Sequence, residues 1–405
     1  MRPTLSLTVC LITAIASSAA AQPLLKHSRN WVQFRMASML AVDDAYIWHG
    51  VLDGRAIHQN SRSTPPTEPN EGNFHTQQQS QFALVKMEIA ALSGDDRHLD
   101  DAGDLLNWVV SNGYDAEQRQ FYLKWNMHTE EWQRDFFPGF NMINVAGLLA
   151  YDAVRPTPEF AEAAENVLGR ILEDAAFQTE PSKSLYESSY LALKLLDTWD
   201  ATGEQRFLNH AQTVVDLANV AMWDDEFGGW FYAGKPGQGP PRLTVKHTHT
   251  NANMIQACFR LNLAGRDDSY RDLAVEALDQ LAAHGRCPEG GWYRHNTRDW
   301  SDPTAPPMVG DGMTTETGAI SVYDRLAQVM VGCALGYRAT QDARYLQWID
   351  ETLDYMEQTI LTHYPAGVNY GYIVAGDYQN TWCHLWGLKA MLAIDALWRD
   401  FGETP

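Results

Sequence analysis

A two-helix unit recurs along this chain, and this recurrence restricts the possible folds more than any other feature of the sequence. In each unit, a helix of apolar and small residues precedes a polar turn, and an aromatic residue or leucine then opens a second helix. The landmark residues are Leu99, Phe160, Phe207, Tyr270 and Tyr345. Their spacing is irregular, which suits helical hairpins with variable inserts better than a strict solenoid.

The two helices of each unit differ in their apolar pattern. The helix after each landmark is amphipathic, as in the run Leu208, Ala211, Val214, Val215 and Ala218. The helix before each landmark is apolar on most of its faces, as expected for a helix buried on two sides. These inner helices are predicted over Phe82–Leu92, Met142–Tyr151, Tyr190–Trp199, Met254–Leu263, Leu326–Tyr337 and, at the end of the chain, Trp382–Leu397.

This alternation predicts an all-α fold, an (α/α)6 or (α/α)7 barrel in which helical hairpins form a toroid. The N-terminal segment Trp31–Trp48 is expected to pair with the last inner helix and close the ring. No linker-like composition divides the chain, so we expect a single domain over residues 22–405.

The first residues have the features of an export signal. Arg2 gives a positive start, Leu5 to Ala16 is a short apolar run, and Ala19-Ala20-Ala21 is a small-residue cleavage site. We therefore expect residues 1–21 to be a signal peptide and the mature chain to be secreted or periplasmic. No later stretch approaches the roughly 20 apolar residues of a membrane helix, so we expect a soluble monomer.

Charge and composition restrict the partners. The net charge of −21 argues against nucleic acid and anionic membranes, which repel an acidic surface. A local group of Arg, Lys and His can still bind an anionic sugar, and the 14 Trp and 17 Tyr favour carbohydrate because sugar rings stack on aromatic side chains. The cysteines of the expected mature chain are scattered singly, which indicates neither a zinc site nor a disulfide framework. We expect no cofactor.

Polar residues at the starts of the inner helices are the candidate site residues. In a ring of helical hairpins, all inner helices start on one side, so these residues would surround a shared cavity that binds an anionic polysaccharide or oligosaccharide. They are His75 and Gln78 at the first helix, Asn141 at the second, Glu187 at the third, Lys246, His247, His249 and Asn251 at the fourth, Glu316 and Tyr323 at the fifth, and Trp382 and His384 at the last.

The segment Lys246–Asn251 is the densest of these groups. In an extended chain, His247 and His249 point to the same side, which suits a metal ion or a proton carrier beside an anion. The simpler alternative is that Thr250 or Asn251 caps the helix and the histidines bind loop carbonyls. We favour a functional role because so many donors are costly as buried filler. We expect no metal, since no third ligand stands at a recognisable spacing.

A second cluster, Trp292-Tyr293-Arg294-His295, follows Gly290-Gly291. It is either catalytic or an ordinary aromatic edge after a glycine turn, since the sister segment Gly228–Tyr232 has the same turn without the Arg and His. A hydrolase would instead need two carboxylates about 5 Å or about 6.5–9.5 Å apart. The acidic candidates are Asp224, Asp225, Glu226, Glu187 and Glu316, of which the first two fit a common acidic turn.

The stretch from Tyr186 through Phe207-Leu208, Gly228-Gly229-Trp230 and Asn251-Ala252-Asn253 to Tyr270 resembles the α/α-barrel carbohydrate-active enzymes. This group includes acylglucosamine epimerases, family 76 mannan hydrolases and several uronan lyases. The tandem Asp of the mannanases is not evident, and Asn253-Met254-Ile255-Gln256 stands where the epimerases have Met-His-x-x-Glu. With Asn, His, Tyr and Arg at the mouth, the chain is more similar to polysaccharide lyase family 38, which contains glucuronan and alginate lyases.

That resemblance implies β-elimination of a β-1,4-linked polyuronate such as glucuronan, cellouronate or alginate. Tyr293 would be the base and acid, His249, Asn251 and either Arg294 or Arg286 would neutralise the carboxylate, and Trp292 and Trp382 would hold neighbouring sugar rings. No metal is required for this chemistry. The alternatives are a glycoside hydrolase with an Asp/Glu pair, a sugar epimerase or isomerase of the acylglucosamine epimerase type, and a sugar-binding protein without catalysis.

Overall fold

The computed structural model describes the backbone of residues 24–40, 47–57, 60–61, 72–174, 185–232, 245–288, 290–293, 295–301, 323–361 and 379–402. The predicted signal peptide, residues 1–21, lies outside these ranges and stays a prediction. Within the described residues, no helix is both long enough and apolar enough to cross a membrane.

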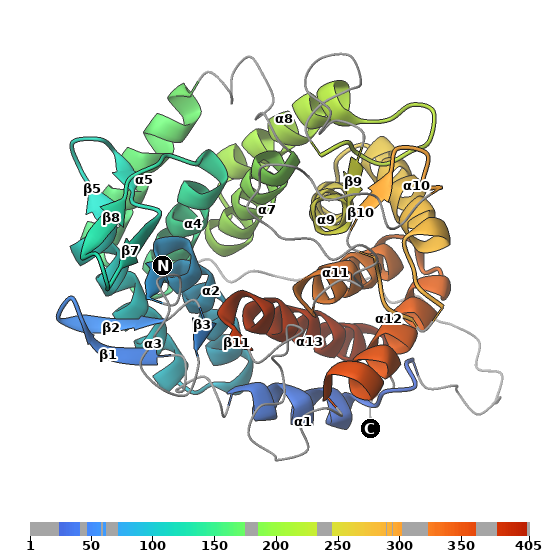
Figure 1. Cartoon of the computed structure of the whole chain (residues 1–405), viewed down its shortest axis with the longest axis horizontal. Helices are drawn as coiled ribbons and strands as arrows, with labels where there is room; N and C mark the ends of the chain where they lie inside the picture. The colour runs from blue at the N-terminus through green and yellow to red at the C-terminus, as the bar shows by residue number, and fades with distance from the viewer. Residues whose placement is uncertain are drawn as a thin grey trace, which may run out of the picture.

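The described helices form a closed double ring (Figure 1). Each inner helix packs on the next, and the last packs on the first. In ring order the inner helices are α2 (Thr76–Ser93), α4 (Pro138–Val154), α7 (Leu185–Thr202), α9 (Thr248–Leu263), α11 (Tyr323–Thr340) and α13 (Thr381–Phe401). The predicted (α/α) barrel is therefore confirmed, with six inner helices in the described part of the chain rather than seven.

Each inner helix is covered by an outer helix. The outer helices are α3 (Arg97–Trp108), α5 (Pro158–Glu173), α8 (Gln205–Met222), α10 (Asp268–His284) and α12 (Arg344–Tyr355), while α1 (Arg29–Leu40) packs on α13. The predicted pairing of the N-terminal segment is thus confirmed for its helical part, whereas Trp48 lies in a strand. Burial explains the two patterns. In α4 every side chain from Asn141 to Tyr151 is buried, whereas α12 buries one face that includes Tyr345, Ile349 and Leu353. Both contribute to one contiguous apolar core.

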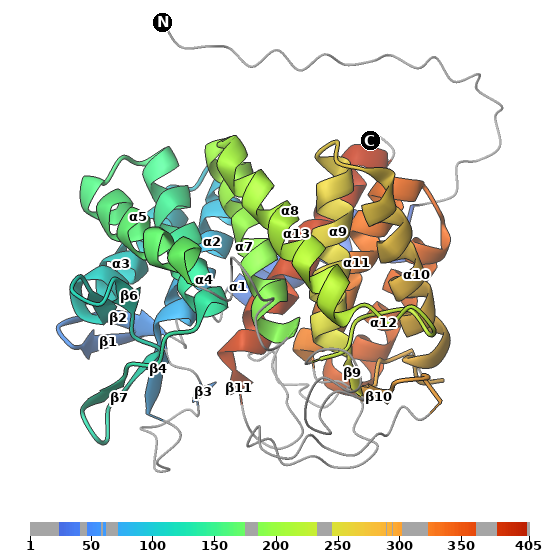
Figure 2. The ribbon, with the colours of Figure 1, turned by 90° about the horizontal axis from the view of Figure 1, so that it is seen from above.

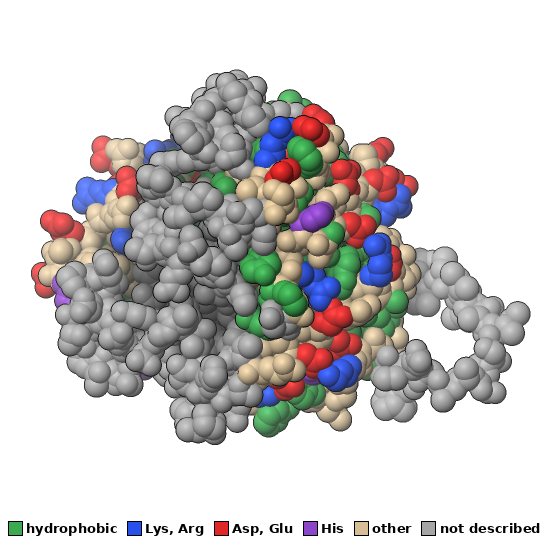
Figure 3. Space-filling view, turned by 45° about the vertical axis from the view of Figure 1, so that its right-hand side comes forward, with side chains coloured by type: hydrophobic (Ala, Val, Ile, Leu, Met, Phe, Trp, Pro, Cys, Tyr) green, Lys and Arg blue, Asp and Glu red, His purple; other side chains and the backbone are tan. Residues whose placement is uncertain are grey.

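The outward faces of the outer helices carry charges of both signs. Figure 3 shows acidic and basic side chains interspersed over the side of the ring that carries α10 and α12. Arg344 bridges these two helices by an ion pair with Asp279 at 3.3 Å, and Arg271 of α10 pairs with Asp268 and Asp272. Exposed pairs of this kind contribute little to stability, so packing of the apolar faces holds the outer helices in place.

Short strands gather at the end of the barrel where the inner helices begin (Figure 2). Strand β4 (Asn73–His75) pairs with β7 (Lys124–Asn126), which pairs with β8 (Glu131–Gln133). Strand β9 (Val245–His247) pairs with β10 (His295–Thr297), and β3 (Asn60–Ser61) pairs with β11 (Gln379–Asn380). Two further hairpins are β1 (Ile47–Val51) with β2 (Gly54–Ile57) and β5 (Tyr114–Asp115) with β6 (Gln120–Phe121). We call this end the mouth.

Three of the described inner helices carry a side-chain amide at their fourth position that binds the backbone of an earlier segment. Gln79, Asn141 and Asn251 each donate a 3.1 Å hydrogen bond to the carbonyl of the residue just before their helix. Their oxygens accept from the backbone N–H of Ile57, Phe121 and Trp230 respectively. We call these contacts the amide clamps. They attach a preceding segment of the chain to the start of an inner helix, so they position the mouth.

The clamp at Asn251 predicts a loss of stability on truncation. Asn251→Ala is expected to strand the buried N–H and C=O of Trp230, which Asn251 binds at 2.8 and 3.0 Å, at a cost of about 1–3 kcal/mol for each stranded group. Urea unfolding followed by circular dichroism measures the change. Asn262→Ala, on the exposed C-terminal turn of the same helix, is the matched control and should change stability by less than about 0.5 kcal/mol. Equal losses in both variants would contradict the clamp.

An ion network joins three inner helices more than two turns beyond their starts. Asp197 of α7 accepts hydrogen bonds from Lys194 at 2.5 Å and from Arg260 of α9 at 2.7 Å. It also lies 3.6 Å from Lys389 of α13, which stands three places from α7 in the ring. Burial lowers the pKa of Lys194 to about 7. Burial alone would raise the pKa of Asp197, but the three cations hold it well below its usual range.

Candidate functional site

His247 and His249 lie together at the mouth. His247 is the last residue of β9 and directly precedes α9, and His249 occupies the second position of that helix. Both side chains are buried, and their ring centroids are 4.0 Å apart with the rings perpendicular. The strand-to-helix junction therefore brings two titratable rings into edge contact. The sequence predicts an extended segment here, whereas the structure places His249 in a helix.

An aromatic wall continues from these histidines onto α7 and α4. The ring of Tyr186 lies 5.4 Å from His249, 5.0 Å from Tyr190 and 5.6 Å from Phe140. On the other side, Tyr232 lies 5.5 Å from His247. Tyr186 and Phe140 were missed as candidates from sequence. Their position was the available signal, because Tyr186 stands second in its inner helix, as His249 does in α9.

The two sequence clusters meet, as the proposed chemistry needs. His295 pairs with His247 across β9 and β10, and the hydroxyl of Thr248 donates a hydrogen bond to the carbonyl of Tyr293. Trp292 is fully buried and donates to Thr352 of α12 at 3.0 Å. Tyr293, the next residue, is half-buried against the core.

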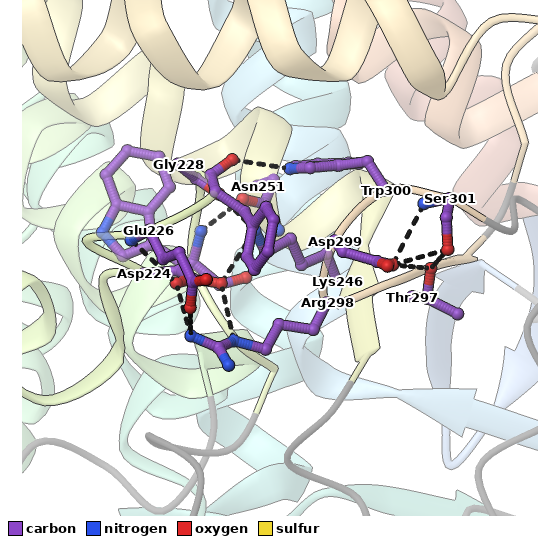
Figure 4. Close-up of polar contacts among 12 residues, drawn as sticks. Asp224, Glu226, Gly228, Lys246, Asn251, Thr297, Arg298, Asp299, Trp300 and Ser301 are labelled. Atoms are coloured by element: carbon purple, nitrogen blue, oxygen red, sulfur yellow. Dashed lines mark hydrogen bonds and ion pairs between the residues drawn. The ribbon is translucent and has the colours of Figure 1, made fainter.

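Lys246 lies behind the wall. It precedes His247 in β9, and its amine is fully buried 3.2 Å from Asp224. Figure 4 shows the amine between Asp224, the Gly228 carbonyl to which it donates, and the indole of Trp300 at 4.7 Å. Burial lowers the pKa of Lys246 to about 8, against the attraction of Asp224. The side chain thus supports the turn after α8, and its amine is bound by the protein itself.

Asp224 is held by cations on two sides. Arg298, from the segment after β10, pairs with Asp224 at 3.3 Å and with Glu226 at 2.7 Å (Figure 4). Burial would raise the pKa of Asp224, but Arg298 and Lys246 lower it below its usual value. Among the described residues, Asp224 therefore stabilises the turn through its ion pairs. This agrees with the interpretation of Asp224-Asp225 as an ordinary acidic turn.

Several other candidates are engaged in contacts within the protein. The amides of Asn251 and Asn141 form clamps. Arg286 binds Glu351 of α12 and lies 5.5 Å from the Trp292 ring. Because their polar atoms are used by the protein itself, we leave these side chains, and Lys246, out of the proposed chemistry. His75 and Gln77 remain at the mouth, joined by a 3.0 Å hydrogen bond.

For five candidates, the structure describes either the backbone alone or no part of the residue. Tyr323 is the first residue of α11, and Trp382 and His384 stand in the first turn of α13, so their helix positions agree with the prediction, while their side chains are not described. Arg294 and Glu316 lie outside the described residues. The roles predicted for these five residues stay predictions.

Several inner helices carry buried polar atoms without a partner among the described residues, and others lie elsewhere, as on Asn296 and Tyr345. Those on the inner helices include atoms of Gln77, Gln78 and Gln81 of α2, Asn253 of α9, Gln328 of α11 and Trp386 of α13. The amide of Gln328 on α11 lies 3.5 Å from the hydroxyl of Tyr190 on α7, although α9 stands between these two helices in the ring. Buried polar groups are nearly always hydrogen-bonded in proteins, so these atoms suit a polar ligand or water inside the ring.

Glu187 joins the starts of α7 and α4. Its Oε2 accepts a 2.7 Å hydrogen bond from the N–H of Gly139. A side chain at Gly139 would place its Cβ only 2.8 Å from that oxygen, so glycine permits the close approach. Burial raises the pKa of Glu187 to about 7, although the bond from Gly139 opposes the shift. The carboxyl can therefore hold a proton near neutral pH.

Glu187 predicts a pH dependence of stability. The unfolded chain releases this proton near pH 4.5 and the folded chain near pH 7, so the unfolded state binds fewer protons in this window and stability falls as pH rises through it. The unfolding free energy of the wild type minus that of Glu187→Gln should therefore decrease from about pH 4.5 to about pH 7. Urea unfolding at a series of pH values measures it.

Glu173→Gln serves as a control of opposite sign. The side chain of Arg119 lowers the pKa of Glu173, so its stabilising pair is lost only as pH falls through the acidic range. If the difference in unfolding free energy between the wild type and Glu187→Gln stays constant between about pH 4.5 and about pH 7, the pKa of Glu187 is not raised and the prediction is wrong.

Comparisons with known proteins show what this fold is similar to. No protein-family model and no curated protein matches the sequence. Among solved structures, a cellobiose 2-epimerase from Bacillus thermoamylovorans has a TM-score of 0.71 at 11% identity, over 91% of this chain and 100% of that one. A D-mannose isomerase has a TM-score of 0.71 at 10% identity, over 94% and 100%. A polysaccharide lyase has a TM-score of 0.56 at 12% identity, over 81% and 92%.

These likenesses show the (α/α)6 barrel. At such low identity they show the fold alone, and the resemblance to polysaccharide lyase family 38 stays a prediction. The three solved proteins are an epimerase, an isomerase and a lyase, so one architecture carries different reactions. The function must therefore be argued from the residues at the mouth.

Proposed function

We propose that this chain is a secreted polysaccharide lyase that cleaves a β-1,4-linked polyuronate, glucuronan or alginate, by β-elimination at the barrel mouth. One observation carries the proposal: His249 stands in edge contact with His247 on one side and Tyr186 on the other. An imidazole pair beside a phenol supplies both a donor for a carboxylate and a group that can move a proton. A solved polysaccharide lyase shares the fold.

The histidines have the first task in this reaction. The C5 proton of a uronate becomes acidic enough to remove only when the neighbouring carboxylate charge is neutralised. Hydrogen bonds from pre-oriented groups in a site that excludes water are effective for this purpose. His247 and His249 are both buried at the start of α9, so we assign the carboxylate to them.

A tyrosine has the second task. In β-1,4-linked glucuronan or mannuronan, H5 and O4 lie on the same ring face, so one phenolate can remove the proton and return it to the leaving oxygen. The C5–H and C4–O4 bonds break, a C4–C5 double bond forms, and the proton ends on O4. We assign this role to Tyr186, whose ring contacts His249, and keep Tyr293, whose carbonyl is bound by Thr248, as the alternative.

The interior of the ring suits a sugar. Gln77, Gln78, Gln81 and Asn253 each carry a buried polar atom without a partner among the described residues. Leaving such an atom unpaired costs about 1–3 kcal/mol, and sugar hydroxyls can satisfy both donors and acceptors. Phe140 and Tyr190 extend the aromatic wall on which a ring can stack.

A sugar epimerase or isomerase is the second candidate. The contact between His247 and His249 favours it, because two imidazoles can remove and return a proton on the carbon next to a carbonyl. The cellobiose 2-epimerase and the D-mannose isomerase match this fold over nearly the whole chain.

Parallel substrate assays separate these reactions. The mature chain is incubated with glucuronan and alginate, and separately with cellobiose and mannose. Ultraviolet absorbance from the unsaturated uronate supports the lyase. New reducing ends without that absorbance indicate a hydrolase, and a changed sugar isomer on chromatography indicates the epimerase or isomerase. A folded chain that leaves both polyuronates intact overturns the proposal.

Export is part of the proposal and rests on the predicted signal peptide. Expression of the full chain with its first 21 residues, followed by sequencing of the exported product, tests it. The product should begin near Gln22. A chain that stays inside the cell with Met1 intact would contradict it.

A further inference from the structure

A histidine and three carboxylates meet where the N-terminal segment crosses α12, on the outside of the ring. His27 is only 6% exposed and its ring contacts that of Trp31, with ring centroids 4.5 Å apart. Asp350 and Asp354 lie one turn apart on α12, and Glu357 follows in the π-helical turn η4 (Met356–Leu361). None of these residues takes part in the chemistry proposed for the mouth.

The imidazole of His27 is oriented for a cation. Its Nδ1 lies 2.9 Å from Oδ1 of Asp350, and since an ionised carboxylate can only accept, Nδ1 carries the proton. The lone pair of Nε2 then faces two more carboxylate oxygens, at 3.5 Å from Asp354 and 3.7 Å from Glu357. A cation between these three acceptors would be favourable, and it can be a proton on Nε2 or a metal ion.

The spacing matches tetrahedral zinc. Zinc–nitrogen and zinc–oxygen bonds are about 2.0–2.2 Å, so two ligands of a tetrahedral ion stand about 3.4 Å apart. The ligand atoms of His27, Asp354 and Glu357 all lie within 4.8 Å of one another, and the two separations from Nε2 are close to the expected value. One imidazole and two carboxylates are a ligand set that zinc accepts, with the fourth position open to water.

Each ligand is also held by a further protein group. Asp350 fixes the His27 ring, while Trp31 and Arg35 bind the other oxygen of Glu357 at 3.0 and 2.8 Å. Metal-binding histidines usually donate their second N–H to a carboxylate or carbonyl, which sets the ring orientation. Glu357 therefore presents Oε2 to His27 in a fixed position.

Lys26 occupies the place of a competing cation. Its amine lies 2.7 Å from both oxygens of Asp354, and its side chain is 67% exposed. A long exposed lysine can swing into solvent, which would free Asp354.

We propose that His27, Asp354 and Glu357 bind a zinc ion that fastens the N-terminal segment to α12, with Asp350 as a positioning residue. Binding releases Lys26 from Asp354. The site is structural and independent of the function proposed for the mouth.

Calorimetric titration of the chelator-treated mature chain with Zn²⁺ tests the proposal. We expect one site that is lost in His27→Gln and Asp354→Asn and weakened about 10–100-fold in Asp350→Asn. Lys26→Met should bind zinc more tightly, because the competing ammonium is gone. This gain does not depend on the other variants folding, although circular dichroism checks each of them.

Two matched variants serve as controls for the zinc titration. Asp268→Asn removes an exposed carboxylate on α10 and should leave this zinc site unchanged, as should His249→Gln at the mouth. If His27→Gln binds zinc like the wild type, or Lys26→Met binds it more weakly, the cluster is an ion-paired seam around a protonated histidine and the proposal is overturned.

Discussion

His249→Gln is expected to lower kcat/KM on the polyuronate that responds by about 10²–10⁴-fold, the usual contribution of a positioned proton-transfer or charge-stabilising group. Glutamine retains a donor and similar bulk but cannot carry the charge of an imidazolium. His249 is buried between His247 and Tyr186, so water cannot easily replace it. Initial rates of unsaturated-uronate formation measure the loss.

Tyrosine variants identify the proton carrier in the same assay. Tyr186→Phe should lose activity to a similar extent, because the ring and its contact with His249 stay while the hydroxyl is removed. If Tyr293→Phe loses activity instead, the carrier is the tyrosine indicated by the family resemblance. Tyr337→Phe, which alters a ring packed on Phe401 near the end of α11, is the control and should keep full activity.

Unchanged kcat/KM in a folded His249→Gln protein would remove His249 from the chemistry. If Tyr186→Phe and Tyr293→Phe also keep wild-type rates, elimination by a mouth tyrosine is excluded. The Glu187 carboxyl would then be the next proton carrier to test.

Asp197→Ala is expected to destabilise the folded chain by about 3–5 kcal/mol, the cost of removing one partner from a buried ion pair. Lys194 is 1% exposed and Asp197 16% exposed. Bulk water therefore cannot hydrate the amine in place of the lost carboxylate. The variant also releases Arg260 of α9 and Lys389 of α13 from their shared acceptor. Urea unfolding measures the loss.

Asp200→Ala is the matched control for that variant. Asp200 accepts from the same Arg260 at 2.7 Å but is 58% exposed, and exposed pairs contribute about 0–1 kcal/mol. Combining Asp197→Leu with Lys194→Met removes both charges and should cost less than Asp197→Ala alone. Equal losses for Asp197→Ala and Asp200→Ala would show that the network is not a buried charge cluster.

The helical repeat was readable from the sequence, while the starts of several inner helices were not. The inner helix predicted over Phe82–Leu92 begins at Thr76, and the one predicted from Met254 begins at Thr248. Both missing turns are polar, so the apolar pattern excludes them. They are nevertheless buried, because the ring encloses polar residues at its mouth.

The roles of the candidate asparagines could not be predicted from their residue type and position alone. Asn141 and Asn251 stand at helix starts, as expected for ligand-binding residues, yet both bind backbone groups of a preceding segment. Tyr186 went unnoticed because an aromatic residue opening a helix is more often part of a core. Each of these roles depends on a partner far away in the chain, such as Trp230, which lies 21 positions before Asn251.

The sequence by itself determined the helical hairpins and the pairing of the N-terminal segment with the last helix, because periodic burial follows from the order of apolar residues. It also identified His247 and His249 as candidates, because the two residues are only two positions apart in the chain. Only the tertiary structure decided which polar side chains face the interior and which bind the protein itself, because closing a ring sets the distances between residues far apart in the chain. The same closure placed His27 against α12 and three inner helices around Asp197, contacts that no local pattern contains.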